Sequence, residues 1–423
     1  MKFEAPKNPN YAASVVRIAN IIPLENCDNV VATTIFGFQA IVGKNTQVGD
    51  LGIVFPAETQ LSDAYCMNNN LFRDENRNKD INEKGYIENS RRCKAVKFRG
   101  HTSSCLFMPL ASLGYILGKK VAQLEEGDTF DFIQGEEICR KYVIKEVGER
   151  KNHQAQPKRF NRVDTKFIPE HFDTENYFRN DRNVGVETEI IVTQKLHGTS
   201  IRIANTIVLR KLSWRERLAK WFGIKVQETE YDLVQGSRKV IKDVTNPYHD
   251  HYYTEDIWSV EGQKLKGLLP ENFIIYGELV GFTSDGAELQ SSYTYDVAPR
   301  HAVLYVYRVA FVNAAGLVTD LSWDQLKEFC LARGLRYVPE LWRGKHKDFK
   351  VAPYLECRLS DTFDNAIPLS HEGTADEGIC IRVDKLTPYI LKAKSQKFYE
   401  HESSLLDKGQ EDLESQESVI DAA

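Results

Sequence analysis

The sequence predicts an α+β protein in which a small all-β domain precedes a larger domain of antiparallel sheets. The first observation is length, because 423 residues fit two domains and a tail better than one ordinary domain. The second is composition, because apolar residues make up 42% of the chain and can fill two cores. The third is patterning, because short β-branched and aromatic segments bounded by Gly, Asn or Pro recur through both halves.

Four short strands are predicted near the N-terminus. They cover residues 13–18, 29–35, 38–42 and 51–56, and turn-forming residues separate them. Many short strands close together indicate a small barrel or sandwich. We therefore expect an OB-like barrel over residues 1–145.

A basic strand is predicted over residues 91–108. Five cations and no acid lie between positions 91 and 99, namely Arg91, Arg92, Lys94, Lys97 and Arg99. Side chains alternate along a strand, so Lys97 and Arg99 should share a face. A solvated strand face is one interpretation, and a groove that tracks a nucleic-acid backbone is the other. We take four of them as candidate nucleic-acid contacts: Arg92, Lys94, Lys97 and Arg99.

A linker and a second domain follow. Residues 146–180 have scattered cations, few apolar clusters and no strong period, which is typical of a linker. The second domain then covers residues 181–400. Within it, a capping box of Ser322 and Gln325 predicts a helix that ends before Gly334.

Another helix is predicted over residues 214–222. Trp214, Leu218, Trp221 and Phe222 fall on one face at helical spacing. We expect this face to pack inward and do not expect its tryptophans to stack on bases.

The charge distribution separates an acidic tail from the rest of the chain. The net charge is −5, but residues 400–423 hold eight acids and one lysine, so the remainder is mildly basic. Because residues 401–423 contain few large apolar side chains, we expect them to form a flexible tail.

Cysteine use and hydropathy indicate an intracellular, cytoplasmic protein. The eight cysteines are scattered without a C-x-x-C pair, so neither a zinc site nor a disulfide framework is expected. No run of about 18 apolar residues occurs, and we expect no membrane span. The N-terminus lacks the apolar stretch of a signal peptide.

The candidate chemistry begins in the string Lys195-Leu196-His197-Gly198-Thr199-Ser200. Extended segments flank the string and predict a hairpin that presents Lys195 at its mouth. Alone, this short pattern is weak evidence, since an exposed lysine before a turn is common.

Four later segments strengthen the hypothesis. In chain order they are Tyr276-Gly277-Glu278, an aromatic strand with Tyr305 and Tyr307, Glu377-Gly378-Ile379-Cys380-Ile381, and Leu391-Lys392-Ala393-Lys394. Side chains two apart on a strand share a face, as Lys392 and Lys394 should. Each segment alone is typical of an edge strand with charged ends, but their joint occurrence in this order is harder to explain that way.

In this order, the segments resemble the motifs of the covalent nucleotidyltransferases, which comprise ATP-dependent DNA and RNA ligases and mRNA capping enzymes. The K-x-H-G-T string, with His where many members have Asp, resembles RNA ligases that seal nicks and RNA-editing ligases. The resemblance covers residues 185–397. Residues 94–100 also resemble the N-terminal OB domain of one RNA-ligase branch. Together, these two resemblances imply a nucleotidyltransferase catalytic domain of antiparallel sheets preceded by an OB-like barrel.

The resemblance implies that Lys195 attacks the α-phosphorus of ATP and forms lysyl-AMP. A model lysine titrates near ~10.4, so the amine needs neighbouring cations or metal to lower its pKa. Lys392 and Lys394, together with Mg²⁺ or Mn²⁺, are the candidates for that effect.

The resemblance also assigns residues to the nucleotide and the metal. Glu278 is expected to contact the ribose, and Glu377 to support metal at the α-phosphate; Glu278 is the second candidate metal ligand. His197 and Gly198 are expected at the nucleotide as part of the lysine motif.

Two further nucleotide contacts each have two candidate residues. Tyr307, or Tyr305 on the same face, is expected to stack on the adenine. Arg238 is expected to contact the ribose or a phosphate, with Arg210 as the alternative.

The sequence departs from the family pattern in two places. Ser200 stands where DNA ligases and capping enzymes commonly carry Arg, which argues against both. Arg308 stands where an acid is frequent, and the sequence assigns it no role.

The predicted function is ATP-dependent RNA ligation of 3′-OH and 5′-phosphate ends in RNA repair. Its expected substrate is a nicked RNA duplex or RNA–DNA hybrid, bound by a monomer. The alternatives are a capping guanylyltransferase, a DNA ligase, or a non-catalytic RNA-binding protein on a ligase fold.

Overall fold

The computed structural model describes residues 3–144, 162–242, 253 and 255–410. The described residues divide into two compact units. The first contains residues 3–144, 175–184 and 392–410, and the second contains the described parts of 162–174 and 185–391. Within the described residues, every helix is too short or too polar to span a bilayer.

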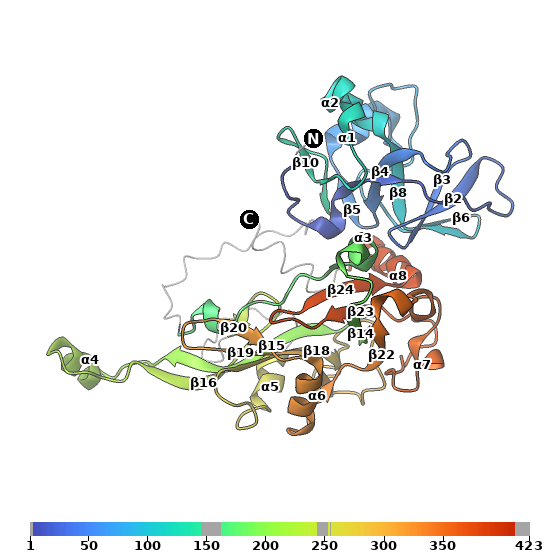
Figure 1. The fold of residues 1–423 in the computed structure, drawn as a ribbon. Helices are drawn as coiled ribbons and strands as arrows, with labels where there is room; N and C mark the ends of the chain where they lie inside the picture. Colours follow the sequence, from blue (N-terminus) through green and yellow to red (C-terminus); the bar gives the residue numbers. More distant parts are fainter. Residues whose placement is uncertain (1–2, 145–161, 243–252, 254, 411–423) are drawn as a thin grey trace. The chain divides into compact units, whose positions relative to one another are not determined.

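The first unit is built on short antiparallel strands (Figure 1). A four-stranded sheet has the order β8 (Cys105–Pro109), β4 (Leu51–Pro56), β1 (Ala13–Arg17) and β9 (Thr129–Phe130). The strands β2 (Val30–Ile35) and β3 (Phe38–Gly43) pair with each other. The four strands predicted near the N-terminus are therefore confirmed. The OB-like barrel is not confirmed, because the described strands of this unit form separate small sheets without closure.

The remaining elements of the first unit are short. They are β5 (Thr59–Leu61), β6 (Val96–Phe98), β7 (His101–Ser103), β10 (Phe132–Ile133), β11 (Glu136–Glu137), β12 (Cys139–Lys141), β13 (Glu175–Asn176), α1 (Asp63–Asn68), α2 (Gly114–Leu117), α3 (Tyr177–Asn180) and α8 (Gln396–Asp407). Buried Phe55, Tyr65, Phe72 and Phe130 form the centre of its core.

The predicted strand over residues 91–108 is interrupted. Strands β6 and β7 form a hairpin, with Lys97 paired to Thr102. Arg99 and Gly100 form its turn with positive φ angles of 50° and 87°. Alternation therefore stops at the turn, and the prediction that Lys97 and Arg99 share a strand face was wrong.

Helix α8 also differs from expectation. Its N-cap is Ser395, its Phe398 is fully buried, and it continues to Asp407. Residues 401–407, predicted to begin a flexible tail, instead form the second half of this helix. The helix belongs to the first unit, although the sequence placed its beginning in the second domain.

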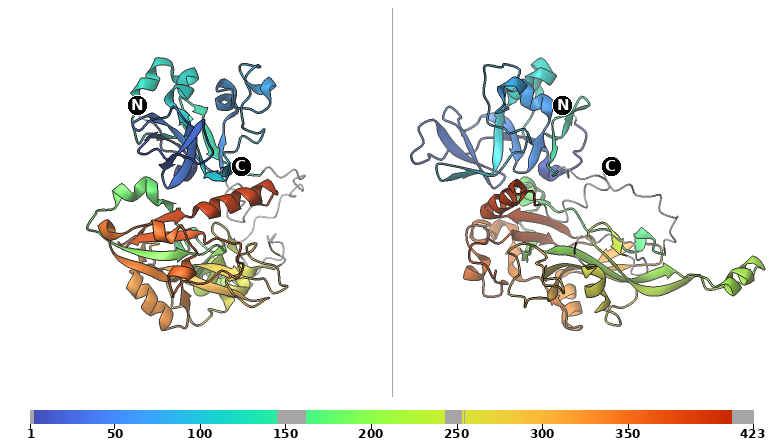
Figure 2. Two further views of the ribbon diagram at one scale, coloured as in Figure 1. Left: turned by 90° about the vertical axis from the view of Figure 1, so that its right-hand side faces the viewer. Right: turned by 180° about the vertical axis from the view of Figure 1, so that it is seen from behind.

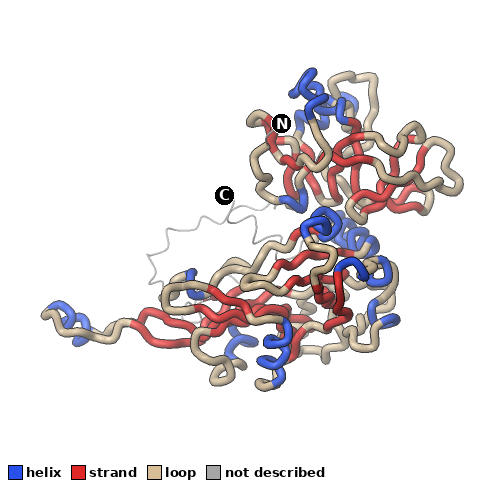
Figure 3. Tube along the Cα trace, in the orientation of Figure 1, coloured by secondary structure: helices blue, strands red, loops and turns tan. Residues whose placement is uncertain are grey.

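The second unit contains two antiparallel sheets (Figure 3). The larger has the order β17 (Ile241–Lys242), β16 (Thr229–Gly236), β15 (Thr199–Leu209), β18 (Phe273–Gly281), β19 (Ala302–Val312) and β20 (Val318–Asp320), with β21 (Arg336–Tyr337) added in parallel to β19. In the other, the strands run in the order β24 (Tyr389–Lys394), β23 (Gly378–Val383), β14 (Glu189–Lys195) and β22 (Glu340–Lys345). The helices are α4 (Trp214–Trp221), α5 (Ile257–Gln263), α6 (Trp323–Leu331) and α7 (Leu359–Thr362).

The lysine string connects these two sheets. Strand β14 ends at Lys195 in one sheet, and β15 begins at Thr199 in the other. The predicted hairpin was therefore wrong, because the two strands pair with other partners. A Cβ on Gly198 would lie 2.1 Å from the carbonyl oxygen of Leu279, so only glycine fits this crossing.

The two predicted helices of this unit had different outcomes. Helix α6 has the expected capping box of Ser322 and Gln325. Helix α4 exists, but its apolar face is exposed: Trp214 is 65%, Trp221 77% and Phe222 66% accessible. The expectation of inward packing was wrong because α4 lies at the far end of the long β15–β16 hairpin, beyond the sheets of its unit (Figures 1 and 2).

Candidate active site

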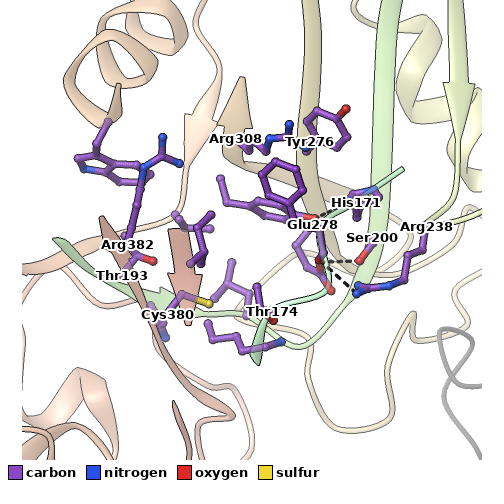
Figure 4. Close-up of a pocket in the computed structure, with 18 residues that line it drawn as sticks. His171, Thr174, Thr193, Ser200, Arg238, Tyr276, Glu278, Arg308, Cys380 and Arg382 are labelled. Atoms are coloured by element: carbon purple, nitrogen blue, oxygen red, sulfur yellow. Dashed lines mark hydrogen bonds between the residues drawn. The ribbon is translucent and has the colours of Figure 1, made fainter. Parts of the chain in front are cut away.

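A pocket in the second unit is lined from both sheets. Its empty space is about 850 Å³, part of it open to solvent. Its lining includes four predicted site residues, Lys195, Arg238, Glu278 and Tyr307, and both departures from the family pattern, Ser200 and Arg308. Figure 4 shows Glu278, Ser200 and Arg238 on one side of the pocket and Arg382 and Thr193 on the other.

Lys195 is held beside Glu377 by strand register. Lys195 at the end of β14 pairs with Gly378 at the start of β23, which places the preceding Glu377 next to it. The Lys195 Nζ lies 2.7 Å from Glu377 Oε2, and His197 Nδ1 lies 3.8 Å from the same oxygen. The Glu377 side chain is only 3% exposed. A nearly buried carboxylate thus bridges the candidate nucleophile and the histidine of its motif.

Glu278 holds the turn that follows Lys195. It lies opposite Ser200 in the pairing of β18 with β15. Its carboxylate accepts hydrogen bonds from the Gly198 backbone N–H at 3.0 Å and from Ser200 Oγ at 3.3 Å. This gives Ser200 a role that the sequence did not assign, since it orients the Glu278 carboxylate at the pocket.

The two candidate arginines lie in different places. Arg238 lines the pocket, and its Nη2 lies 2.9 Å from Asp173 Oδ1. Arg210 instead pairs with Glu216 of helix α4 at 2.9 Å, outside the residues that line the pocket. Of the two, Arg238 is therefore the one positioned to meet a ligand there.

A β-bulge separates the two candidate tyrosines. Tyr276 of β18 pairs with Arg308, but the next residue, Gly277, pairs with Val306, so Tyr307 is an extra residue in β19. Tyr305 and Tyr307 therefore do not share a face, contrary to expectation. Tyr307 lines the pocket together with its neighbour Arg308.

The hydroxyl of Tyr307 has a fixed partner. It lies 2.5 Å from Nδ1 of His171, which also lines the pocket. The His171 ring packs edge-on against Tyr276, with ring centroids 5.1 Å apart. These contacts fix the position of the Tyr307 ring in the pocket wall.

Arg308 and Arg382 are buried in the pocket wall. Arg308 pairs with Asp320 and lies over the Phe172 ring, 3.5 Å from its centroid. Arg382 pairs with Asp384 and donates to the carbonyl of Leu321 at 2.9 Å. Both guanidinium groups are thus neutralised by acids near the end of β20 and β23.

Several lining residues were missed by the sequence. His171 and Phe172 fall in the segment predicted as a linker and carried no signal. The sequence did contain a signal for Arg382. It is the only charged residue inside the apolar strand β23, and a charged residue there needs a buried partner.

The unit boundary falls within β24, so that its last residues, which include Lys392 and Lys394, belong to the first unit. There, Lys394 Nζ lies 2.8 Å from Glu402 Oε1 and 4.7 Å from the centroid of the Phe398 ring, both in α8. The expectation that these two lysines act at Lys195 stays a prediction.

The candidate nucleic-acid contacts of the first unit are engaged by acids. Arg92 has a side chain only 2% exposed and pairs with Glu58 and Asp407, which argues against a role as a phosphate contact. Lys94 lies 2.7 Å from Glu88 and 2.8 Å from Asp407.

The other two candidates lie at the β6–β7 hairpin. Lys97 Nζ is 2.8 Å from Glu400 of α8, and Arg99 donates to the carbonyl of Asn26. Both side chains are on the surface of the unit. Lys97 therefore has an acidic partner there, whereas Arg99 is held by a neutral one.

Comparison with known proteins shows what the domain that contains this pocket is similar to. The RNA ligase family model matches residues 188–394, which contain every motif from Lys195 to Lys394. No curated protein sequence matches the chain. The match confirms the resemblance of residues 188–394 to RNA ligases.

Solved structures of a Naegleria gruberi RNA ligase share the fold over nearly the whole chain. A lysine-to-alanine mutant with ATP and Mn is 14% identical, with a TM-score of 0.55, covering 93% of this chain and 99% of that chain. An aspartate-to-alanine apo mutant is 14% identical, with a TM-score of 0.58 and coverages of 94% and 99%. The complex with PPi is 14% identical, with a TM-score of 0.55 and coverages of 93% and 98%.

Proposed function

We propose that this protein is an ATP-dependent RNA ligase that uses Lys195 as its nucleophile. The observation that carries the proposal is the meeting of Lys195, Glu377 and His197 beside one pocket, within the residues that match the RNA ligase family model. The Naegleria ligase structures were determined with ATP, AMP, PPi and Mn, the molecules that such a reaction involves.

The reaction has three steps, of which the first two transfer the adenylyl group and the third releases it as AMP. The Lys195 amine attacks the α-phosphorus of ATP, a P–N bond forms and pyrophosphate leaves. A 5′-phosphate oxygen of the RNA then attacks the same phosphorus, which restores the amine and yields an RNA adenylate. Finally a 3′-hydroxyl attacks the 5′-phosphate, the phosphodiester forms and AMP leaves.

The ion pair of Lys195 with Glu377 controls the first transfer. A carboxylate at 2.7 Å stabilises the protonated, non-nucleophilic form of the amine. Glu377 must therefore release this amine before it can attack. His197, 3.8 Å from the same carboxylate oxygen, is placed to take over part of that contact.

The two acids of the pocket suit a divalent cation. Glu278 and Glu377 supply carboxylate oxygens, which Mg²⁺ and Mn²⁺ prefer as ligands. When bound, such a cation neutralises charge on the phosphates of the nucleotide. Among the described residues no cluster of three or more metal-binding side chains occurs, so these two acids need phosphate oxygens or water to complete coordination.

The pocket wall provides the contacts for ATP. Tyr307, fixed by His171, presents its ring to the adenine, and Glu278 contacts the ribose. Arg238 meets the ribose or a phosphate. Lys392 and Lys394 act on the phosphates.

The proposed substrate is a nicked RNA duplex or RNA–DNA hybrid with 3′-OH and 5′-phosphate ends, sealed by a monomer in RNA repair. The first unit is proposed to act as an OB-like nucleic-acid-binding domain. Ser200 argues against a DNA ligase or a capping enzyme, because its hydroxyl is used to orient Glu278 where those families commonly have Arg.

Labelled nucleotides and matched nicked duplexes test the function. We expect covalent labelling from α-labelled ATP with Mg²⁺ or Mn²⁺, and sealing of nicks with RNA at the 3′-OH side. Labelling from GTP alone would identify a capping enzyme. Absence of any covalent nucleotide under these conditions would favour the non-catalytic RNA-binding protein.

A further inference from the structure

The tip of the β15–β16 hairpin has a surface that the proposed reaction does not use. We call residues 210–225 the arm; it contains helix α4 and its flanks. It holds six cations and one acid. It also exposes five large apolar side chains, namely Trp214, Leu218, Trp221, Phe222 and Ile224.

The aromatic and cationic side chains of the arm are arranged as a strip with charged borders. At 100° per residue, Trp221, Trp214, Leu218 and Phe222 occupy one continuous stripe of the helix. Arg217 borders the stripe on one side and Arg215 borders it on the other. The Arg215 guanidinium lies 5.4 Å from the centroid of the Trp214 ring, and the Trp221 and Phe222 rings meet edge-on at 4.7 Å.

Some cations of the arm are available to a partner. Glu216, the acid of the arm, is used by Arg210 and the capping box, and Lys220 pairs with Glu228 at 2.6 Å. Within the described chain, Lys211, Arg217 and Lys225 have no acidic partner. The partner of the arm should therefore be an anion with flat apolar surfaces.

We propose that the arm binds unpaired nucleotides of the RNA substrate, a proposal that rests on the proposed ligase function. Bases stack on Trp214, Trp221 and Phe222, while phosphates pair with the bordering cations. Single-stranded RNA offers both surfaces at once. In duplex RNA the bases are already stacked on each other, so a paired strand offers only its phosphates.

The hairpin that carries the arm also fixes its distance from the reacting ends. Strand β15 begins at Thr199, next to the pocket residue Ser200, and runs for 11 residues to Leu209 without interruption. At about 3.3 Å per residue it spans about 36 Å. At about 3.4 Å per base pair this corresponds to roughly ten base pairs. An RNA held at the pocket therefore presents an unpaired strand to the arm when its duplex ends about ten base pairs from the nick.

A series of nicked duplexes, in which the paired segment beside the nick is shortened and continues as an unpaired tail, tests this proposal. We expect wild-type affinity to rise once the paired segment is shorter than about ten base pairs, because the unpaired tail then reaches the arm. The double variant Trp214→Ala with Trp221→Ala should lose that rise, about tenfold in Kd, and bind tail-free duplexes like the wild type. A matched control, Leu317→Ala with Leu386→Ala, removes two equally exposed apolar side chains outside the arm and should retain the rise.

Three outcomes would overturn the proposal. They are an unchanged tail dependence in the tryptophan variant, flotation of the wild type with anionic lipid vesicles that the variant loses, and a dimer that the variant dissolves. Lysyl-AMP formation from ATP, measured in parallel, separates the two proposals. It should be equal in wild type and variant, and its absence from both would refute the ligase function while leaving the tail measurement interpretable.

Discussion

Two cationic regions of this protein look alike in sequence and differ in structure. The segment 91–99 of the first unit has five cations and no acid, and the arm at 210–225 has six cations and one acid. In the first region, Arg92, Lys94 and Lys97 pair with acids, two of which come from helix α8, about 300 positions later in the chain. In the arm, Arg217 and Lys225 have no acidic partner within the described chain.

The comparison teaches that a run of cations does not by itself define a surface for RNA. Local sequence shows the charges of a segment but not the acids that the fold brings to it. The same holds for apolar side chains, since the tryptophans of α4 have helical spacing yet remain uncovered. We therefore propose that the arm contributes more to RNA binding than the β6–β7 hairpin does.

The largest expected effect is the loss of covalent labelling in a Lys195 variant whose two cationic regions are unchanged. Lys195→Ala should abolish covalent labelling by ATP, because the proposed P–N bond forms on the Lys195 amine beside Glu377. RNA binding, measured by gel shift, should change by less than about twofold, since only one side-chain amine is lost. Lys266→Ala, which removes an exposed lysine of the same unit, serves as the control and should label normally. Residual labelling of the Lys195→Ala protein would contradict the assignment.

The next effect concerns the charges of the arm. Arg217→Glu with Lys225→Glu should weaken binding of long-tailed RNA by about tenfold and reduce the slope of log K against log salt by about 0.7 per lost phosphate contact. Equilibrium binding over a range of salt concentrations measures both. A slope equal to that of the wild type would show that these cations do not meet phosphates.

A smaller effect is expected in the first unit. Lys97→Ala and Arg99→Ala should each weaken RNA binding only about twofold to threefold, because Lys97 already pairs with Glu400 and Arg99 with a backbone carbonyl. Sealing should fall in proportion, while covalent labelling by ATP stays unchanged. If either variant were more damaging than the charge reversal in the arm, the ranking of the two regions would be reversed.

The smallest effect tests how buried acids hold the cations of the first unit. Burial raises the pKa of Glu58 from 4.5 to about 7, against the attraction of Arg92. Between these two values the folded state binds a proton on Glu58 that the unfolded chain has lost. The stabilisation from protonated Glu58 is therefore complete below pH 4.5 and is lost as pH rises through 7. Glu58→Gln cannot ionise and should flatten this dependence, by up to about 3 kcal/mol between the two limits. Denaturant unfolding at pH 5 and pH 8, with wild type in parallel, measures it. An identical pH dependence in both proteins would contradict the raised pKa.

Much of the fold was predictable because it depends on local patterns. The strands around Lys195, Glu278, Tyr307 and Glu377 are apolar runs with turn residues at their ends, and all of them exist. Ser322 and Gln325 predicted a helix start because a capping box is formed by residues only three apart.

The rest depended on contacts between distant segments. The bulge at Tyr307 and the crossing of Leu196–Gly198 between sheets are set by pairing with β18, and no local pattern reports that pairing. His171 enters the pocket from a segment without any regular period. The order of the motifs along the chain therefore predicted the candidate catalytic residues. The residues that hold them in place, and the acids that pair with the basic segment, could be identified only from the fold.

Mapping the covalent nucleotide tests the central claim most directly. After incubation with ATP and Mn²⁺ without RNA, proteolysis and mass spectrometry of the labelled peptides should place one AMP on the Nζ of Lys195. The same adduct should disappear when nicked RNA with a 5′-phosphate is added. AMP on any other side chain, or none at all, would contradict the account.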